Sequence, residues 1–381
     1  MDIGGEGDDP LKNHADRALV EYLRVQPFYL DLAEVVARIA KQSLDSRGIK
    51  IHSVQSRAKD PSSFGRKAST PLEEAPSTPK YLEPLKQITD LAGVRIITHF
   101  LDTLGDVDQM LVAEFDVVEK SNKGIALIES DRFGYQSIHY LVRIRGERAG
   151  LPEYRRFSGH IVEVQVRTIL QHAWAEIEHD IQYKSLRAIP TIIRRRFVAL
   201  AGMLEIADRE FQAIDDANRT LEDAANAKVR AGDLTGAEIT PKALKLFLDR
   251  RLGPDGRMSD WSYDYTAGLL KTLGFRDLKE VDAAISPYGD GHRVCKALHD
   301  SKQGQLYRFE QMILAALGEQ WIARHPWSKE EAKWIDLFQS HLKKFSDAGI
   351  PIGTFKLGDV ATSSDLPAAQ GLDAEEGSNR T

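Results

Sequence analysis

The sequence predicts an α+β fold, in which a mixed sheet flanked by helices is followed by a mainly helical C-terminal domain. Two observations predict it. The segments 93–100, 135–145 and 160–168 read as strands, rich in β-branched and aromatic residues and largely alternating in polarity. The stretches between and after them repeat apolar residues at helical spacing. A chain of 381 residues has room for two such domains.

The N-terminal part is predicted to be helical before the first strand. Apolar residues recur at helical spacing from Ala15 to about Leu44, with a break expected near Pro27 because proline lacks a backbone N–H. Residues 1–12 are acidic and glycine-rich and are predicted to be disordered. Residues 53–80 are rich in Ser, Pro and Lys and are predicted to form a loop, with a disordered linker as the alternative.

The second half is predicted to be almost entirely helical. Residues 169–230 carry helical patterning throughout, and a further helical block runs from about residue 240 to 345 with short Gly/Pro/Asp turns. We therefore expect one domain over residues 13–230 and a second over 235–350. The last residues, 358–381, are polar and acidic and are predicted to be a flexible tail.

The composition excludes several classes of protein. A net charge of −6 argues against a protein that coats nucleic acid without specificity. Cys295 is the single cysteine, which excludes internal disulfides and cysteine-based zinc sites. The acidic first residues do not resemble a signal peptide, and no apolar run approaches the roughly 18 residues of a membrane span. The expected location is cytoplasmic, with no membrane partner.

The strand predicted at 160–168 carries a row of polar side chains. Val162, Val164 and Val166 share one face, whereas Glu163, Gln165 and Arg167 share the other, because side chains alternate along a strand. One interpretation is a sheet with a solvated face. The other is a row of fixed polar groups that binds a charged ligand.

The helix after this strand has a polar stripe. It consists of His172, Glu176, His179 and Tyr183. Two histidines and a glutamate at this spacing can converge on zinc, although the pattern is not that of the zincin helix. The alternatives are a hydrogen-bonding wall beside the strand and a face that meets solvent.

Basic residues and hydroxyls alternate in the segment 56–69. Lysine and arginine beside serine suit a polyphosphate, because one is a point charge and the other a planar fork. Asp90 comes just before the strand predicted at 93–100, and Glu163 lies in the row described above. Two carboxylates near a polyphosphate loop indicate Mg²⁺ held between protein and phosphate oxygens. The basic residues are Arg57, Lys59, Arg66 and Lys67, with Ser62 and Ser63 between them.

Four segments together resemble the synthetase domain of the RelA/SpoT-type alarmone synthetases. They occur in the order that this family has and span about residues 55–185. The resemblance implies a nucleotidyltransferase-like sheet. The segments are "SRAKDPSSFGRK", "DLAGVR", "GYQSIHY" and "EVQVRTILQHAWAEIEHDIQYK".

The resemblance also implies a reaction and its residues. Members of the family transfer the β,γ-pyrophosphate of ATP to the 3′-hydroxyl of GDP or GTP, giving (p)ppGpp and AMP. By residue-wise correspondence, Arg57 and Arg95 sandwich the adenine, and Lys59, Ser63 and Lys67 hold the ATP phosphates. Asp90 and Glu163 bind Mg²⁺ and are the catalytic residues, with Glu163 as the base for the 3′ proton. Tyr135 stacks on the acceptor guanine, and His139 and Gln165 contact the acceptor.

The sequence departs from the family pattern in two places. Many members have a lysine four residues before the stacking tyrosine, where this chain has Asp131, and an acid there would repel a 5′-diphosphate. A proline-rich insertion also separates Lys67 from Asp90. Only about 50 residues precede Arg57, too few for the hydrolase half of the long enzymes, so the chain is identified as a synthetase-only member.

Asp131 leaves alternative functions open. Toxic relatives pyrophosphorylate the tRNA 3′ end or adenine nucleotides, and residues 143–196 hold 11 Lys and Arg against 6 acids, which suits a phosphate backbone. A catalytically inactive nucleotide-binding module is the third interpretation. The domain at 235–350 either packs its own core or inhibits the enzyme by covering its active site. A homo-oligomer is a further open alternative.

Overall fold

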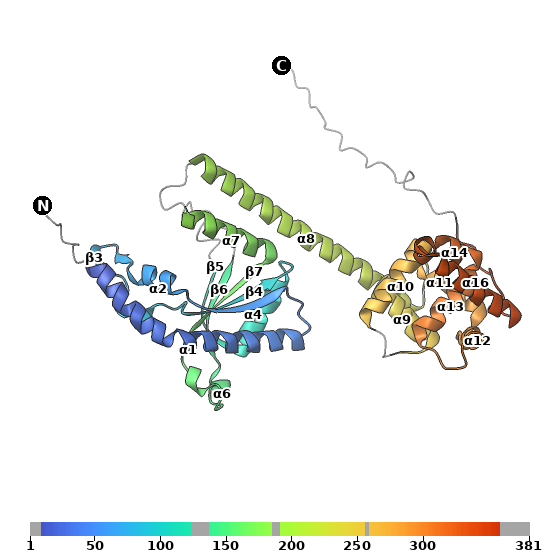
Figure 1. The fold of residues 1–381 in the computed structure, drawn as a ribbon, viewed down its shortest axis with the longest axis horizontal. Coiled ribbons are helices and arrows are strands. Elements are labelled where there is room, and N and C mark those ends of the chain that lie inside the picture. The colour runs from blue at the N-terminus through green and yellow to red at the C-terminus, as the bar shows by residue number, and fades with distance from the viewer. Residues whose placement is uncertain (1–8, 123–136, 185–190, 256–258, 359–381) are drawn as a thin grey trace, which may run out of the picture. The chain divides into compact units, whose positions relative to one another are not determined.

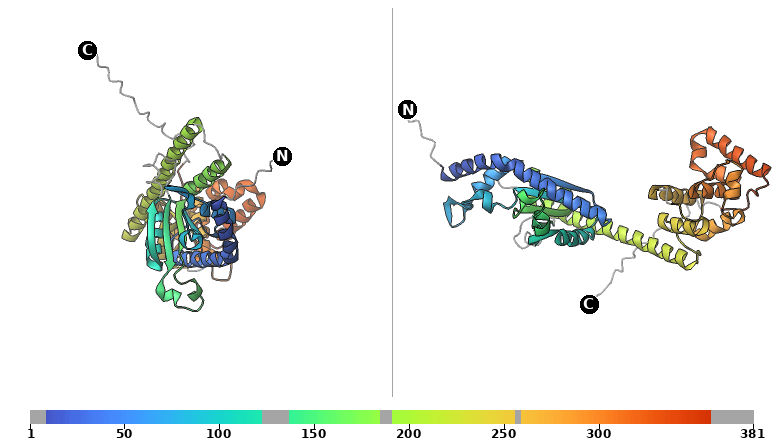
Figure 2. Two further views of the ribbon diagram at one scale, coloured as in Figure 1. Left: turned by 90° about the vertical axis from the view of Figure 1, so that its left-hand side faces the viewer. Right: turned by 90° about the horizontal axis from the view of Figure 1, so that it is seen from below.

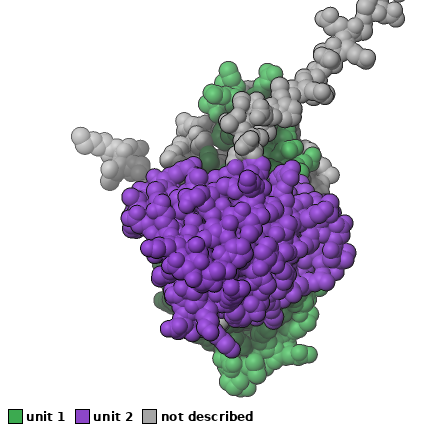
Figure 3. Space-filling model, turned by 90° about the vertical axis from the view of Figure 1, so that its right-hand side faces the viewer, with its two compact units in different colours: residues 1–215 green, residues 216–381 purple. Residues whose placement is uncertain are grey.

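The chain is divided into two compact units. The computed structural model describes residues 9–122, 137–184, 191–255 and 259–358 (Figure 1). Contacts separate residues 1–215 from residues 216–381, and Figure 3 colours these two units separately. The boundary lies within helix α8 (Thr191–Ala231), whereas the sequence placed it between residues 230 and 235.

A five-stranded mixed sheet forms the centre of the first unit. Its strand order is β1-β4-β7-β6-β5, in which β4 and β7 are parallel and every other neighbouring pair is antiparallel. This confirms the predicted fold class. Strands β4, β6 and β7 correspond to the three predicted strands, whereas β1 and β5 were not predicted. The bounds are β1 Ser53–Ala58, β4 Ala92–Thr98, β5 Phe115–Asn122, β6 Ile138–Ile144 and β7 Val162–Thr168.

One face of this sheet is apolar and is covered by two helices. Helix α1 (Pro10–Ser46) lies along it, and α4 (Thr103–Glu114) packs beside α1 (Figures 1 and 2). Val162, Val164 and Val166 of β7 join their side chains to this core, as the alternation predicted. The opposite set of β7 side chains therefore points to the other face of the sheet. That face carries the candidate site.

Helix α1 is longer than predicted. It begins at Pro10, so residues 10–12 are helical rather than disordered, and it continues through Pro27 without a break. Proline removes one backbone hydrogen bond within the helix. Packing on both sides compensates, since Tyr22 stacks on Phe64 at 4.3 Å and Leu32 is fully buried. The prediction of a break near Pro27 was wrong for this reason.

The segment 53–80 is ordered, so the prediction of a loop was wrong. Its first residues form β1, paired with β4, and the next turn enters helix α2 (Pro61–Ala68). Asp60 caps α2, because its Oδ1 accepts a hydrogen bond from the Ser63 N–H at 2.9 Å. The proline-rich insertion forms a small hairpin of β2 (Pro71–Leu72) and β3 (Ala75–Pro79), followed by α3 (Pro84–Gln87).

Short helical turns complete the first unit around its last strands. They are α6 (Gly146–Ala149) and the 3₁₀ turn Arg155–Phe157, which precede β7. Helix α7 (Ile169–Lys184) follows β7 directly and contacts both β7 and β4. Trp174 of α7 meets Phe197 of α8 edge to face at 5.4 Å.

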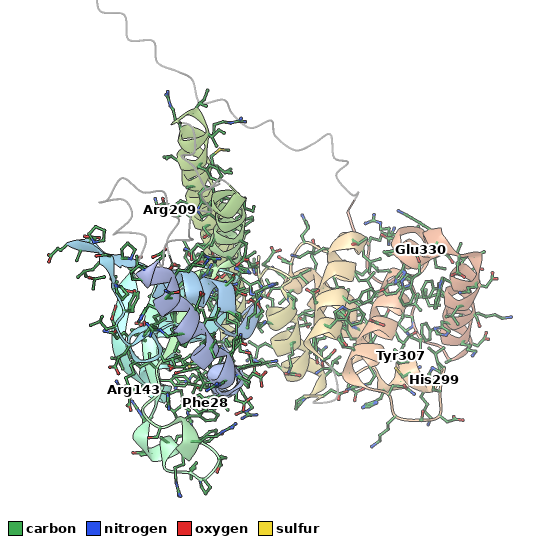
Figure 4. All side chains as sticks on the ribbon, turned by 60° about the vertical axis from the view of Figure 1, so that its left-hand side comes forward. Phe28, Arg143, Arg209, His299, Tyr307 and Glu330 are labelled. Atoms are coloured by element: carbon green, nitrogen blue, oxygen red, sulfur yellow. The ribbon has the colours of Figure 1, made fainter. Side chains whose placement is uncertain are left out.

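The second unit is a bundle of helices with its own core. Its buried residues include Leu244, Phe309 and Phe345. His299, in the segment between two helices, lies 2.7 Å from the hydroxyl of Tyr307 (Figure 4). Within the described residues no helix is both long and apolar enough to cross a membrane. The elements are α9 Pro241–Leu252, α10 Asp260–Leu273, α11 Leu278–Ile285, a 3₁₀ turn Ser286–Tyr288, α12 His292–Lys296, α13 Gln305–Leu317, α14 Glu319–Arg324, α15 Pro326–Glu330 and α16 Ala332–Asp347.

Candidate functional site

The polar face of the sheet gathers most of the residues singled out in the sequence. Residues that lie opposite one another on neighbouring strands share a face. Gln165 of β7 lies between Arg95 of β4 and His139 of β6, and Glu163 lies opposite Gly93. Gly93 in turn lies opposite Arg57 of β1. Four strands that are distant in sequence therefore contribute to one polar surface.

A continuous chain of hydrogen bonds runs across this face. Arg167 donates to Gln165 Oε1, and Gln165 Nε2 donates to Glu163 Oε2 at 2.9 Å. The other carboxylate oxygen accepts from His139 Nδ1 at 2.8 Å. That leaves His139 Nε2 as the acceptor for the Ser137 hydroxyl, 2.9 Å away. Glu163 is thus held by neighbours on both sides.

This row is buried rather than solvated. Glu163 is 8% exposed, Gln165 9% and Arg167 5%. Ionisable groups at such depth are costly unless other groups compensate their charge. The interpretation of a wet sheet face is therefore wrong, and the alternative of fixed polar groups agrees with the geometry.

Three guanidinium groups crowd the same face. Burial, followed by the positive charge of Arg95, lowers the pKa of Arg167 to about 10. Burial and the charge of Arg57 lower the pKa of Arg95. Buried Nε atoms of Arg95 and Arg167 have no hydrogen-bond partner among the described residues. The face therefore carries more positive than negative charge, although Arg167 alone of the three arginines is buried.

The Arg57 side chain lies over Gly93 of the neighbouring strand. A methyl group at Gly93 would lie 3.4 Å from Arg57 Nε and 3.5 Å from its Cγ, so the arginine side chain passes directly over the glycine. Arg95 is fixed differently, because its Nη1 donates to Glu176 Oε1 of α7 at 2.8 Å. The two arginines predicted to sandwich a base thus come from adjacent strands.

A carboxylate between two lysines lies at the start of β4. Lys59 Nζ is 2.6 Å from Asp90 Oδ2, and Lys67 Nζ is 3.0 Å from Asp90 Oδ1. Burial acts to raise the pKa of Asp90, but the two lysines outweigh it and the pKa is lowered. Asp90 is therefore ionised at neutral pH and is bracketed by two positive groups.

Helix α2 presents the remaining predicted phosphate ligands. Ser63 and Lys67 lie on it, one turn apart, and the Ser63 hydroxyl accepts from Arg66 Nη2 at 2.7 Å. The start of the helix is capped by Asp60, whose pKa is lowered chiefly by its hydrogen bonds from Ser62 and Ser63. The cap fixes the part of α2 from which these side chains extend.

The donor set is suitable for a divalent cation. Asp90 and Glu163 provide carboxylate oxygens, which are the hard donors that such ions prefer. Each oxygen of Asp90 meets one ammonium group and retains a second lone pair. A bound ion would supply further positive charge to phosphate oxygens beside these carboxylates.

Some predicted residues fall outside this geometry. Tyr135 and Asp131 lie outside the described residues, as does the side chain of His179. Glu176, in the polar stripe of α7, is engaged by Arg95, while His172 Nδ1 lies 3.8 Å from the same Glu176 oxygen. Of this stripe, Glu176 thus contacts an arginine of the sheet, in agreement with the interpretation of a wall beside the strand.

Sequence reasoning missed Tyr22 of α1. Its hydroxyl donates to the Lys59 carbonyl at 2.6 Å, and burial raises its pKa to about 12. Tyr22 thereby ties α1 to the turn that carries Lys59. The only signal for it in the sequence was its place in the apolar stripe of the first helix, where a core position was the simplest interpretation.

The basic excess at 143–196 is partly neutralised. Arg145 lies 3.6 Å from Asp116, Arg148 lies 3.0 Å from Glu114, and Arg156 lies 2.8 Å from Asp31. Their acidic partners come from outside the segment, so the count of charges within it overstated the local field. Among the described residues of this segment, Arg167 is buried in the site.

Comparison with known proteins agrees with the motifs. Residues 56–188 match the family model described as "Region found in RelA / SpoT proteins". GTP pyrophosphokinase YjbM of Bacillus subtilis (strain 168) is 30% identical over 148 residues, which are 38% of this chain and 65% of that protein. GTP pyrophosphokinase YwaC of the same organism is 31% identical over 133 residues, or 35% and 60% of the two chains. The chain thus spans less than two-thirds of the curated relatives it matches.

Solved structures give similar matches. The small alarmone synthetase 1 from Bacillus subtilis aligns with 52% of this chain and 98% of its own, at 27% identity and a TM-score of 0.44. The same protein bound to its product pppGpp aligns at 26% identity and a TM-score of 0.42, over 52% and 97% of the two chains.

Proposed function

We propose that the chain is an ATP-dependent pyrophosphokinase, because residues 56–188 match the family model described as "Region found in RelA / SpoT proteins". The reaction proposed is transfer of the β,γ-pyrophosphate of ATP to the 3′-hydroxyl of GDP or GTP, which yields (p)ppGpp and AMP. The two matched relatives are named GTP pyrophosphokinases.

The observation that carries the proposal is the gathering of three arginines, Arg57, Arg95 and Arg167, on the polar face. Mutual repulsion among Arg57, Arg95 and Arg167 contributes to the lowered pKa of the last two. The negative charge of a bound nucleoside triphosphate would offset this repulsion. The face is therefore electrostatically complementary to a nucleoside triphosphate.

In the proposed transfer one bond forms and one bond breaks. The acceptor 3′ oxygen forms a bond to the β-phosphorus of ATP while the bond between that phosphorus and the α,β-bridging oxygen breaks, so AMP departs. The proton of the 3′-hydroxyl passes to Glu163. Such transfers depend mainly on positioning and charge neutralisation. The hydrogen bonds from His139 and Gln165 hold the Glu163 carboxylate in one orientation for this task.

The donor nucleotide is proposed to bind between β1, β4 and α2. Arg57 and Arg95 would enclose the adenine, since a guanidinium plane stacks well on an aromatic ring. Lys59, Ser63 and Lys67 would contact the phosphates, with both lysines turning from Asp90 toward the stronger anion. Asp90 and Glu163 would hold a divalent cation, for which we propose Mg²⁺.

The acceptor is proposed to bind on the β6 side of the face. His139 and Gln165 lie there, and Tyr135 would supply the stacking platform. Three arginines of the segment 143–196 are paired with acids from outside it, which weakens the case for a long phosphate backbone. We therefore prefer a free guanine nucleotide over tRNA as the acceptor. Adenine nucleotides and an inactive nucleotide-binding module are the competing outcomes of the test below.

An acceptor panel tests the proposal. The purified chain would be incubated with ATP labelled in its β- and γ-phosphates, with and without Mg²⁺, and with GDP, GTP, ADP, ATP or bulk tRNA. We expect label in the guanosine nucleotides only when Mg²⁺ is present. Label in tRNA or in adenine nucleotides would show that the acceptor is not a guanine nucleotide. If the folded chain transferred label to none of these acceptors, the proposal would be refuted.

A matched pair of variants localises the activity. Glu163→Gln should reduce transfer by at least about a hundredfold, because a general base contributes 10²–10⁴ in rate. ATP binding, measured by calorimetry, should remain within a few-fold. The control is Glu147→Gln, an equivalent change at an exposed residue of α6, which should leave transfer unchanged.

A further inference from the structure

Four aromatic side chains lie ring against ring in a row on the helical unit. Trp261 and Tyr265 of α10 stack with 6.0 Å between ring centroids, and Tyr265 stacks on Trp327 of α15 at 6.1 Å. Trp327 then meets Trp334 of α16 at 4.6 Å. We call these four residues the aromatic ladder. Each of them keeps part of its surface in solvent, and Trp261 is 72% exposed.

The exposed end of the ladder is not explained by the packing of the helical unit. Tyr265, Trp327 and Trp334 pack against the core of that unit, whereas Trp261 lies outside it. A tryptophan ring left in water forgoes hydrophobic free energy that a covering surface would recover. Tryptophan is also among the residues that contribute most to binding at protein interfaces. Trp261 therefore has the properties of a contact residue rather than of a core residue.

The opposite end of the ladder already holds a cation. Lys333 Nζ lies 5.4 Å from the centroid of the Trp334 ring, which is within the range of a cation–π contact. The face of an aromatic ring attracts positive charge because of its quadrupole. A positive group of a ligand at Trp261 would repeat, at the exposed end, the contact that Lys333 makes at the other.

Two exposed carboxylates flank the ladder. Asp264 lies three residues after Trp261 on α10, so the two side chains are neighbours on one face of that helix. Glu330, which is labelled in Figure 4, lies three residues after Trp327 on α15. In the part of the chain that the structure describes, neither carboxylate forms an ion pair. Both are available to neutralise a bound cation.

A third carboxylate adds negative charge near the middle of the ladder. Glu310 of α13 is hydrogen-bonded to Thr266, the neighbour of Tyr265 on α10, and has no ion-pair partner among the described residues. Burial raises the pKa of Tyr265, and the negative charges of Glu310 and Glu330 raise it further. These two acids therefore act on a ring in the middle of the ladder, where a bound cation would offset their charge.

The charge of this surface selects among classes of partner. Nucleic acids and anionic membranes would be repelled by the three carboxylates. Sites for small free amines are concave and enclose most of the ligand, whereas the ring of Trp261 is open to solvent. A planar guanidinium can stack on an aromatic face while its N–H groups donate to carboxylates. An arginine side chain of another protein satisfies all of these conditions.

We propose that the aromatic ladder, with Asp264 and Glu330, is a docking site for an arginine-bearing segment of a partner protein. The arginine stacks on the free face of Trp261 and donates to the flanking carboxylates, and neighbouring residues of the segment cover Tyr265 and Trp327. This inference goes beyond the proposed reaction, because none of these residues belongs to the site on the sheet. It gives the helical unit a binding role of its own.

Peptide binding to the full chain tests the proposal. The probe is a fluorescein-labelled peptide of alternating glycine and arginine with about six arginines, and the comparison peptide has lysine at the same positions. Fluorescence anisotropy at physiological salt should give a Kd at least about fivefold lower for the arginine peptide, because a guanidinium stacks better than an ammonium group. Trp261→Ala should raise that Kd about tenfold, and Trp261→Phe should raise it less.

Further variants separate the docking site from general attraction to an acidic chain. Glu330→Gln should weaken binding and reduce its dependence on salt. The matched control is Asp347→Asn, at an exposed residue about 20 Å along α16 from Trp334, which should leave the Kd unchanged. Circular dichroism should show the same helix content in every variant, since Trp261, Glu330 and Asp347 are all exposed.

Four results would overturn the proposal. Equal affinity for the arginine and lysine peptides would mean that charge alone is recognised. An unchanged Kd for Trp261→Ala would remove the ladder from the contact. Displacement of the peptide by an equal concentration of spermidine would assign the surface to a free amine. Tighter binding of a single-stranded oligonucleotide than of the arginine peptide would assign it to nucleic acid.

Discussion

Gly93 lies directly beneath the side chain of Arg57 in the candidate site. The Arg57 side chain passes over it, with Nε 3.4 Å from where a Cβ would lie. Arg57 thus crosses over β4 on the face that also carries Arg95. A planar guanidinium held in this way is ready to stack on a ring without further ordering.

Enlarging Gly93 tests the placement of Arg57. Gly93→Val should raise the KM for ATP about tenfold, because its methyl groups would displace the arginine and remove stacking of about 1–2 kcal/mol. Gly93→Ala is the matched control, since a single methyl at 3.4 Å makes an ordinary contact. The measurement is steady-state kinetics with the acceptor saturating. Equal KM values for the two variants would mean that Arg57 does not touch ATP.

Helix α2 depends on its cap more than a buried helix would. It is short, spanning Pro61–Ala68, and only Phe64 and Ala68 of its residues are buried. Asp60 satisfies the N–H of Ser63 and the hydroxyl of Ser62. The positions of Ser63 and Lys67 follow from this one side chain.

Removing the cap should therefore affect both stability and binding. Asp60→Ala should lower the free energy of unfolding by about 1 kcal/mol, the usual cost of losing an N-cap, and should also weaken ATP binding. Asp60→Asn should do neither, because an asparagine oxygen caps equally well. Thermal denaturation and calorimetric titration of the two variants measure these effects, and identical behaviour of Ala and Asn variants would contradict the role of the cap.

Some helices and strands could be predicted from their own sequence, and others could not. Strand β7 was predictable because its two faces carry different chemistry, with valines against the core and Glu163 and Gln165 opposite them. Strand β1 was not, because "SVQSRA" is polar and becomes a strand by pairing with β4. The continuity of α1 past Pro27 likewise depends on packing by distant residues, which no local pattern contains.

The candidate site was predictable by residue type but not by arrangement. The motifs drew attention to Lys59, Lys67 and Asp90 separately, whereas their joint ion pair requires the fold that brings α2 beside β4. Tyr22 gave no signal, since a tyrosine in an apolar helical stripe is usually a core residue. The tyrosine predicted to stack on the acceptor remains a prediction.

On the scale of the whole molecule, each unit has a separate core. The core of the helical unit draws on residues from Ala225 to Leu357, and the cores of the first unit on residues from Ala15 to Val166. Domains with separate cores generally unfold as separate cooperative units. Scanning calorimetry should therefore resolve two transitions, and a single two-state transition would contradict this division.

A buried carboxyl allows one of these transitions to be identified. Burial raises the pKa of Glu310, in α13, from 4.5 to about 7. Between these values the folded chain binds a proton more tightly than the unfolded chain, so stability falls as the pH rises through this range. At pH 8 the cost is roughly 3 kcal/mol, and Glu310→Gln should recover it.

The control for Glu310→Gln is the same melting experiment at acidic pH. At pH 4 the carboxyl is protonated in both states, so Glu310→Gln and the unmodified chain should melt alike. At pH 8 only the transition of the helical unit should move upward in temperature. A shift in both transitions, or in neither, would show that Glu310 does not act within that unit alone.

The row of hydrogen-bonded side chains on the polar face of the sheet restricts which amino-acid substitutions can be accepted during evolution. Each member of the series Arg167, Gln165, Glu163 and His139 uses the hydrogen-bonding capacity of the next. Replacing one of them leaves a buried neighbour without its hydrogen-bond partner. This costs more folding free energy than replacing two partners together by a compatible pair. Lineages that acquire a new acceptor preference should therefore exchange these residues in sets, and substitutions at the exposed rim should come first.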